Sequence, residues 1–483
     1  MKSGDLTALA PLLATAATAI VVMLAIAWRR SHRLTVILTL AGLAAALAAL
    51  GPAWRLTPRH VTTLLVVDPY ALLYAGLILA AALVVAMLSY GYLERRQGRR
   101  EEFYVLLLLA ALGAAVLAAS DHFVSFFLGL ELLSVSLYAL IAYPRAAPAH
   151  VEAGLKYLVL AGVSSAFLLF GMALVYGELG TMQLARLAAG AGAAGGTAGA
   201  AVLAGLGMIL VGIGFKLALV PFHLWTPDVY EGAPAPAAAF VATASKGAVF
   251  ALLLRYFTIV DVHKYAALMI LFSAIAVASM FVGNLLALRQ ANLKRLLAYS
   301  SISHMGYLLV ALVASGPGAA AAVTYYLAAY FVTMLGAFGV VGALSGGEKE
   351  AALLEDYRGL AWRRPGAAAV LTVMMLSLAG LPLTAGFIGK FYILRAGVGE
   401  GLWLLGGVLV VTSAIGLFYY LRVIRMLYAH AADEEGAAGR LTASRPGWLE
   451  AAALAALMVL LVALGVYPSP AIRVIEAAVA GLF

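Results

Sequence analysis

Lysines within apolar sequence are the residues of this chain best suited to chemistry. Lys216 stands in the apolar run GIGFKLALVPFH, five residues before Pro221, and Lys246 ends the run AFVATASK. An ammonium at bilayer depth costs at least about 2.5–3.5 kcal/mol. Burial disfavours the charged form of a lysine and a nearby carboxylate favours it, so a lysine between these influences can take up and release a proton near neutral pH. We expect Lys216 and Lys246 to carry protons; the alternative is that each ammonium reaches the membrane surface.

Two further charges interrupt apolar sequence. Glu131 lies within FFLGLELLSVSLYAL, and Ser134 and Tyr138 follow it at helical spacing, so one helix face would carry a carboxylate, a hydroxyl and a phenol. Lys390 ends LAGLPLTAGFIGK, where glycine and proline allow a helix to break. We expect Glu131 and Lys390 to join the proton-carrying set; a static polar contact between helices is the alternative for Glu131.

Other titratable side chains are weaker candidates. His223 and His304 could relay protons, since histidine titrates near pH 7, but each could equally be a structural histidine. Lys156, near the end of an apolar run, could be a relay or a surface charge. No spacing indicates a metal site. The chain has no cysteine, so no Cys-ligated iron–sulfur cluster is expected in it. Residues 190–195, GAGAAG, have the letters of a dinucleotide-binding motif, but no strand is predicted before them, so we expect no dinucleotide site there. We expect no catalytic redox residue and no cofactor or metal ligand.

The elements that must position these residues are membrane helices. The 483 residues are 65% hydrophobic and only 11% charged, which indicates an all-α polytopic membrane protein. Nucleic acid is not expected as a partner despite the net charge of +9, because the basic residues stand in short loops. About fourteen spans are predicted: 6–28, 34–51, 68–90, 103–119, 122–142, 151–177, 200–222, 236–258, 265–288, 296–315, 319–345, 366–397, 402–429 and 448–467. Asp68, before Pro69, is predicted to cap a helix.

Two of these spans are predicted to be broken. The seventh is interrupted near Pro221 and the twelfth, which is too long for one straight crossing, near Pro382. Breaks at matching places five spans apart indicate inverted repeats of five helices, spans 4–8 and 9–13. The predicted division is therefore 1–102, a three-helix segment; 103–258 and 259–430, the two repeats; and 431–483, a last helix and tail.

Charge in the loops predicts the orientation. Nineteen lysines and arginines follow odd-numbered spans, whereas seven stand on the other side, which includes both termini. The positive-inside rule places the nineteen in the cytoplasm and both termini outside it. In a bacterium, the chain would cross the inner membrane many times with periplasmic ends.

Three segments carry a resemblance to a known family. GFKLALVPFHLWTPDVYEGAPAPAAAFVATASKGAVFALLLR, GNLLALRQANLKRLLAYSSISHMGYLLVAL and LSLAGLPLTAGFIGKFYIL resemble the antiporter-like proton-translocating subunits of respiratory complex I. The resemblance covers roughly residues 65–470, and DVYEGAPAP points to one branch of that family. The Ala/Gly-rich stretch 185–200 departs from the family pattern.

The resemblance implies a charged series halfway across the membrane. Glu131 would modulate Lys216, Lys246 would be the central relay, Lys390 would face the outer half-channel, and His223 and His304 would link them. It also implies that FMN, iron–sulfur clusters and quinone reside in partner subunits, and that the partners are other membrane and peripheral subunits of complex I, antiporter-like neighbours among them, and membrane lipids. Subunits of a Mrp-type cation/proton antiporter or of a membrane-bound hydrogenase-type complex are the alternatives.

Overall fold

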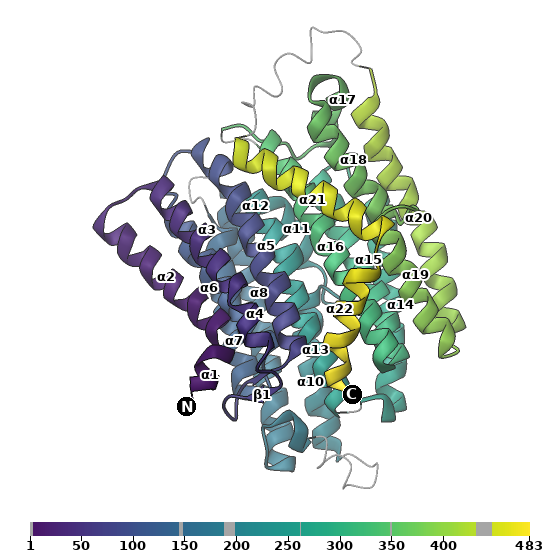
Figure 1. Ribbon diagram of the computed structural model, residues 1–483. Helices are drawn as coiled ribbons and strands as arrows, with labels where there is room; N and C mark the ends of the chain where they lie inside the picture. The colour runs from purple at the N-terminus through teal and green to yellow at the C-terminus, as the bar shows by residue number, and fades with distance from the viewer. Residues whose placement is uncertain (1–2, 144–147, 188–198, 261, 348–349, 431–446) are drawn as a thin grey trace.

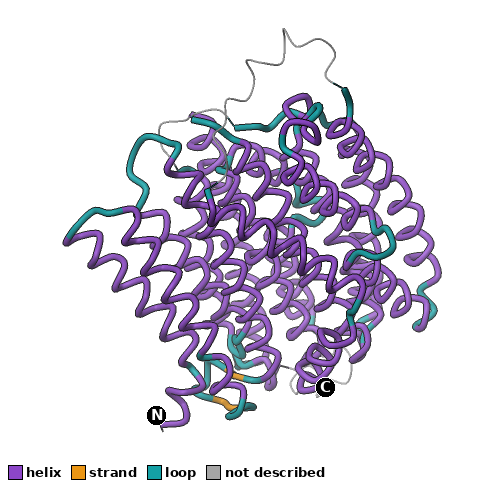
Figure 2. The backbone as a smooth tube through the Cα atoms, turned by 45° about the horizontal axis from the view of Figure 1, so that its top comes forward, coloured by secondary structure: helices purple, strands orange, loops and turns teal. Residues whose placement is uncertain are grey.

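The protein is a bundle of helices, seen in a computed structural model that describes residues 3–143, 148–187, 199–260, 262–347, 350–430 and 447–483 (Figure 1). The GAGAAG stretch at 190–195 lies outside the described residues. A single short antiparallel pair of strands occurs among them, β1 (Arg59–His60) with β2 (Val66–Val67), at the end of the bundle that also holds the N-terminus (Figure 2).

The described part of the first half of the chain is almost entirely helical. They are α1 (Ser3–Ala8), α2 (Ala10–Trp28), α3 (His32–Ala48), α4 (Leu50–Trp54), α5 (Pro69–Glu94), α6 (Glu102–Ala118), α7 (Phe123–Ile141), α8 (Pro148–Leu179), α10 (Ala200–Leu217), α11 (Trp225–Gly232), α12 (Ala235–Phe240), a π-helical turn (Val241–Ser245) and α13 (Lys246–Val260).

The second half continues the same pattern. Its helices are a 3-10 turn (Val262–Lys264), α14 (Ala266–Leu288), α15 (Leu293–Ala314), α16 (Gly316–Leu344), a 3-10 turn (Leu354–Tyr357), α17 (Leu360–Arg363), α18 (Pro365–Ala379), α19 (Ala385–Gly399), α20 (Trp403–Tyr428), α21 (Trp448–Val466), α22 (Ser469–Val479) and a closing 3-10 turn (Ala480–Leu482).

The protein is an all-α, multi-pass membrane protein. Twelve described stretches of helix are long and apolar enough to cross a membrane. The other two predicted spans, 103–119 and 366–397, fall on α6 and on α18 with α19, of which α6 and α18 are apolar but shorter helices. The number of crossings, fourteen, therefore stays a prediction. The N- and C-termini lie at the same end of the bundle, as an even number of crossings requires (Figure 1).

Three helical rods form the centre of the bundle. The apolar windows of α12–α13, α15 and α16 are 100%, 89% and 94% buried, whereas those of α2, α14 and α21 are 33% buried. The outer helices therefore present apolar side chains outward, where lipid can solvate them. The central rods carry Lys246 and His304, so their titratable groups are shielded by protein on every side.

Both predicted breaks are present. α10 ends at Leu217 because Ala218 adopts a left-handed conformation (φ 60°), and α18 ends at Ala379 because Gly380 does the same (φ 80°). At the second break the chain returns very close to α18. A Cβ on Gly386 would lie 2.0 Å from the carbonyl oxygen of Ser377, so only glycine permits this approach.

Asp68 has the predicted cap role and a second role that the sequence did not reveal. Its Oδ1 accepts a hydrogen bond from the backbone amide of Ala71 at 2.7 Å, which caps α5. Both carboxylate oxygens also accept from the guanidinium of Arg255 on α13, at 2.7 and 2.9 Å. Both side chains are buried, so the pair fixes the end of α13 against the start of α5.

Candidate functional site

Lys216 lies in the last turn of α10, immediately before the first break. Its side chain is 3% exposed, and its Nζ donates to Ser134 Oγ on α7 at 2.7 Å. The ammonium also lies 5.2 Å from the centre of the Tyr157 ring, an aromatic face that stabilises a cation. The serine predicted to share a face with Glu131 is thus the direct partner of the lysine.

Glu131 lies one turn before Ser134 on α7. Its Oε1 accepts from Ser165 Oγ of α8 at 2.6 Å, and its side chain is only partly buried. No ion pair within 4.0 Å joins Glu131 to Lys216, both of which are described. Two serine hydroxyls therefore hold the two charges, and the carboxylate acts on the ammonium through space.

Lys246 is the first residue of α13 and follows a π-helical turn. π-Turns occur often at functional sites, because the wider turn frees backbone groups and redirects side chains. The side chain is 1% exposed, and its Nζ donates to Ser301 Oγ on α15 at 2.5 Å. The Tyr230 ring lies 5.5 Å from the same ammonium, and the Tyr230 hydroxyl is 3.4 Å from Ser301 Oγ.

His304 stands three residues after Ser301 on α15, so it lies on the same face one turn further along. Its Nδ1 is 2.5 Å from the hydroxyl of Tyr326 and its Nε2 is 3.0 Å from that of Tyr420. Tyr420 also hydrogen-bonds Ser300. Both ring nitrogens are thus engaged by phenols that can donate or accept, which suits a group that passes protons in either direction.

Lys390 lies in α19, just beyond the second break. Its Nζ donates to the carbonyl oxygens of Leu378 and Ala379, at 2.9 and 3.1 Å. These carbonyls close the C-terminal end of α18, where the helix dipole favours a cation. The Tyr307 ring, three residues after His304 on α15, lies 5.2 Å from the ammonium.

One face of α15 therefore joins the two last lysines. Ser301 contacts Lys246, Tyr307 contacts Lys390, and His304 stands between them at three-residue spacing. Sequence reasoning singled out His304 but missed Ser301 and Tyr307. The i, i+3, i+6 spacing in SISHMGY was the available signal.

None of the three buried lysines has an ion-pair partner within 4.0 Å among the described residues. A buried charge without such a partner is costly. Each amine contacts neutral hydroxyls, carbonyls or aromatic faces instead. Because these partners do not fix the charge of the amine, they suit a group that gains and loses a proton.

Two of the weaker candidates lie apart from this series. The Lys156 side chain is 45% exposed and forms ion pairs with Glu152 at 2.8 Å and Asp228 at 3.1 Å, as its surface-charge alternative expects. His223 lies buried in the turn between α10 and α11, and its Nδ1 has no hydrogen-bond partner among the described residues. It follows Lys216 by seven residues along the chain.

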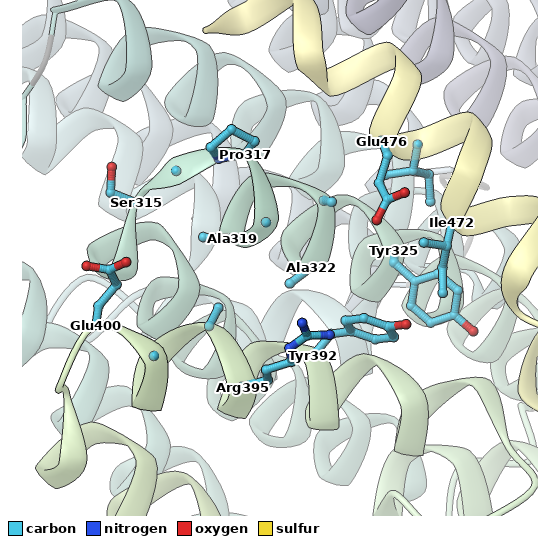
Figure 3. A pocket seen from close by; sticks show the side chains of 16 residues that line it. Ser315, Pro317, Ala319, Ala322, Tyr325, Tyr392, Arg395, Glu400, Ile472 and Glu476 are labelled. Carbon is cyan, nitrogen blue, oxygen red and sulfur yellow. The ribbon is translucent and has the colours of Figure 1, made fainter.

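A cavity of about 360 Å³ is lined by the second half of α19, the helix that carries Lys390 (Figure 3). It is enclosed by the start of α16, the end of α19 and the tail helix α22. Tyr392 and Arg395 enter it from α19, and Glu476 enters it from α22, while Glu400 lines it at the end of α19. Arg395 is five residues beyond Lys390, or about 7.5 Å along the helix.

The chain matches known proteins over nearly all its length. The family model described as "NADH:quinone oxidoreductase/Mrp antiporter, TM" matches residues 120–416. The chain belongs to this family. It is 53% identical over 480 residues to NADH-quinone oxidoreductase subunit N of Ectopseudomonas mendocina, covering 98% of this chain and 96% of that one. It is 54% identical over 491 residues to subunit N of Nitrosospira multiformis, covering 99% and 97%.

Solved structures show the same fold. A chain of respiratory complex I from Thermus thermophilus with bound aureothin is 35% identical, with a TM-score of 0.81, covering 97% of this chain and all of that one. A chain of the Mrp complex from Dietzia has a TM-score of 0.87 at 23% identity, covering 100% and 98%, and shows the fold alone. The family resemblance expected from the sequence is confirmed.

Proposed function

We propose that the chain translocates protons as subunit N, an antiporter-like subunit of an NADH–quinone oxidoreductase. The observation that carries the proposal is a series of three buried lysines, Lys216, Lys246 and Lys390, which have no ion-pair partner among the described residues. The chain that holds them is more than half identical to proteins named as that subunit. DVYEGAPAP points to the same branch.

Glu131 sets the charge of Lys216 in this mechanism. When charge shifts in a neighbouring subunit during quinone reduction, the attraction between Glu131 and Lys216 changes, and Lys216 takes up or releases a proton. The proton passes to Lys246, which donates to Ser301 Oγ, and then by way of His304 to Lys390, whose ammonium lies on the face of the Tyr307 ring. In this proposal the chain moves protons, and the electrons travel in partner subunits.

The cavity at the end of α19, the helix that carries Lys390, supports a release route on that side. Arg395, Glu400 and Glu476 line it (Figure 3). A proton leaving Lys390 reaches Arg395 about 7.5 Å further along α19. In this proposal His223 relays protons at the Lys216 end of the series, and Lys156 is a surface charge.

The chain works as one subunit of a larger enzyme. Its partners are the other subunits of complex I, and FMN, iron–sulfur clusters and quinone belong to them. In this proposal the chain lies in the bacterial inner membrane with periplasmic termini. Residues 103–258 and 259–430 are the two inverted repeats, and each contributes one broken helix and at least one lysine to the series.

Replacing Lys216 with alanine tests the proposal. We expect the assembled complex carrying Lys216→Ala to pump fewer protons per quinone reduced, because the series loses its first amine. The measurement is proton uptake by reconstituted vesicles against NADH oxidation. Lys264→Ala, which removes an exposed lysine beyond α13, is the matched control and should pump normally. Normal stoichiometry in a fully assembled Lys216→Ala complex would contradict the mechanism, and cation exchange without NADH oxidation would favour a Mrp-type antiporter.

A further inference from the structure

The series of contacts along α15 is interrupted between Ser301 and His304. Lys246 donates to Ser301 Oγ, but no hydrogen bond among the described residues joins Ser301 to the His304 ring. Both ring nitrogens are already engaged, Nδ1 by the Tyr326 hydroxyl at 2.5 Å and Nε2 by the Tyr420 hydroxyl at 3.0 Å. A proton that arrives at Ser301 therefore enters the ring through one of these phenols.

A buried hydroxyl close to this interruption has no hydrogen-bond partner. Tyr330, on α16, is 3% exposed, and its hydroxyl makes no hydrogen bond with a described residue. An unpaired buried hydroxyl destabilises a protein, and phenylalanine would fill nearly the same space without that cost. A tyrosine at this position therefore indicates a use for the hydroxyl itself.

The neighbours of Tyr330 are the groups that the relay must join. Its ring lies against the His304 ring, with the two centroids 5.4 Å apart. The Ser301 hydroxyl and the Tyr326 phenol both act on Tyr330 electrostatically, without the geometry of a hydrogen bond. Tyr326 stands four residues earlier on α16, so the two phenols share one face of that helix.

The two helices bring these groups to matching levels. Only Ser315 separates α15 from α16, so the helices run in opposite directions. The three residues from Ser301 to His304 span about 4.5 Å of α15, and the four from Tyr330 back to Tyr326 span about 6 Å of α16. Tyr326 is level with His304, to which it is hydrogen-bonded. Tyr330 therefore falls near the level of Ser301.

We propose that Tyr330 carries the proton from Ser301 to Tyr326. The inference rests on the function proposed above. The Lys246 ammonium gives a proton to Ser301, whose own hydroxyl proton passes to Tyr330. Tyr330 gives its proton to Tyr326, and Tyr326 gives its own to Nδ1 of His304. Each hydroxyl thus loses one proton and gains one, while Lys246 becomes the neutral amine and His304 the imidazolium.

Tyr330→Phe tests this link, because it removes only an oxygen that has no hydrogen-bond partner among the described residues. A positioned proton-transfer group contributes about 100-fold or more to a rate, so the variant should turn over at least about tenfold more slowly even if other groups replace it in part. The measurements are NADH oxidation and proton uptake by vesicles that hold the assembled complex. Heavy water should slow the variant more than the wild type, because proton transfer then limits turnover.

Tyr74→Phe is the matched control. Tyr74 is buried on α5 and its hydroxyl is hydrogen-bonded to Thr324 at 3.1 Å, so this variant loses a hydrogen bond that Tyr330→Phe does not. If both hydroxyls served stability alone, Tyr74→Phe would be the more harmful change. We expect the reverse in turnover: Tyr74→Phe near the wild-type rate, and Tyr330→Phe slow but with normal assembly and thermal stability. Equal rates for the two variants overturn the proposal.

A double variant distinguishes one shared path from two separate effects. Tyr326→Phe removes the next link, so adding it to Tyr330→Phe should make the complex no slower than the slower single variant. Effects that multiply in the double variant overturn the proposal. The Lys216→Ala complex separates this failure from failure of the proposed function. If that complex pumps poorly while Tyr330→Phe behaves as the wild type, the link fails and the role of the subunit stands.

Discussion

At the scale of single residues, the buried lysines of the candidate site are distinguished by their neutral hydrogen-bond partners. Lys246 donates to Ser301, and Lys390 donates to two backbone carbonyls. A carboxylate in contact would keep an amine charged, whereas a hydroxyl can donate to the neutral amine or accept from the ammonium. In the proposed mechanism the serine is therefore as much part of the relay as the lysine.

Ser301→Ala tests this role. Hydrogen bonds to charged groups contribute about 1.5–3 kcal/mol, so the variant should slow proton-coupled quinone reduction roughly tenfold or more. Ser89→Ala, the same change on the buried face of α5, removes a hydroxyl that donates to the carbonyl of Val85 and should leave turnover near the wild-type rate. Activity of the complex and acidification of vesicles are the measurements. Equal rates for the two variants would mean that Ser301 has no part in transfer.

At the scale of elements, buried charge clusters hold helices together away from the proton-carrying centre. Glu350, in the connector after α16, contacts Lys294 at the start of α15 and Tyr92 on α5, and accepts from the amide of Ala235 at the start of α12 at 3.0 Å. One carboxylate therefore connects the ends of three helices, α5, α12 and α15, and the last two belong to the central rods. Burial alone would raise the pKa of Glu350, but the charges of Lys294 and Arg96 outweigh it, so the pKa of this carboxyl lies below its usual value.

Acid should release this cluster. Because the pKa of Glu350 is lowered on folding, its stabilisation is fully present above the ordinary glutamate pKa and is lost as the pH falls through the lowered value. Breaking a buried ion pair costs about 3–5 kcal/mol, so Glu350→Gln should melt at a markedly lower temperature than the wild type at pH 7.5. The difference between their melting temperatures should become smaller towards pH 4. Thermal unfolding of the full chain in detergent is the measurement. Glu355→Gln, which breaks an exposed ion pair, is the control. If the difference in melting temperature between the wild type and Glu350→Gln stayed constant with pH, protonation of Glu350 would not control the stability of this cluster.

At the scale of the whole molecule, the bundle places basic loops and termini at opposite ends. α17, which ends at Arg363, lies at the end of the bundle away from the labelled termini (Figure 1). This arrangement agrees with the count of basic residues, which predicts periplasmic termini. Within the bundle, two of the three most buried rods carry Lys246 and His304, and the outer helices present apolar side chains outward.

Cysteine labelling tests the orientation, and the chain is suited to it because it has no cysteine of its own. Gly481→Cys, at a position with no atom within 4 Å of the new Cβ, should react with a membrane-impermeant maleimide from the periplasmic side. Gln97→Cys, in the exposed loop after α5, should react only after the membrane is opened. Labelling in the reverse order would show that the chain is inserted the other way.

The sequence alone determined the class of protein, the two breaks and the charged candidates. Continuous apolar runs define membrane helices because backbone groups in lipid must bond within their own segment. A lysine, glutamate or histidine in such a run is conspicuous because its burial is costly. The sequence alone could therefore identify Lys216, Lys246, His304 and Lys390 as candidates for proton transfer.

Only the tertiary structure decided which groups meet. Ser134, Ser301 and Tyr307 are ordinary residues in their own helices, and each gains its role from a lysine on another helix. The same holds for Asp68, whose cap was predictable and whose pairing with Arg255 was not, because 187 residues separate them. Periodicity describes one helix at a time, whereas a proton needs neighbours from several helices, and packing alone supplies them.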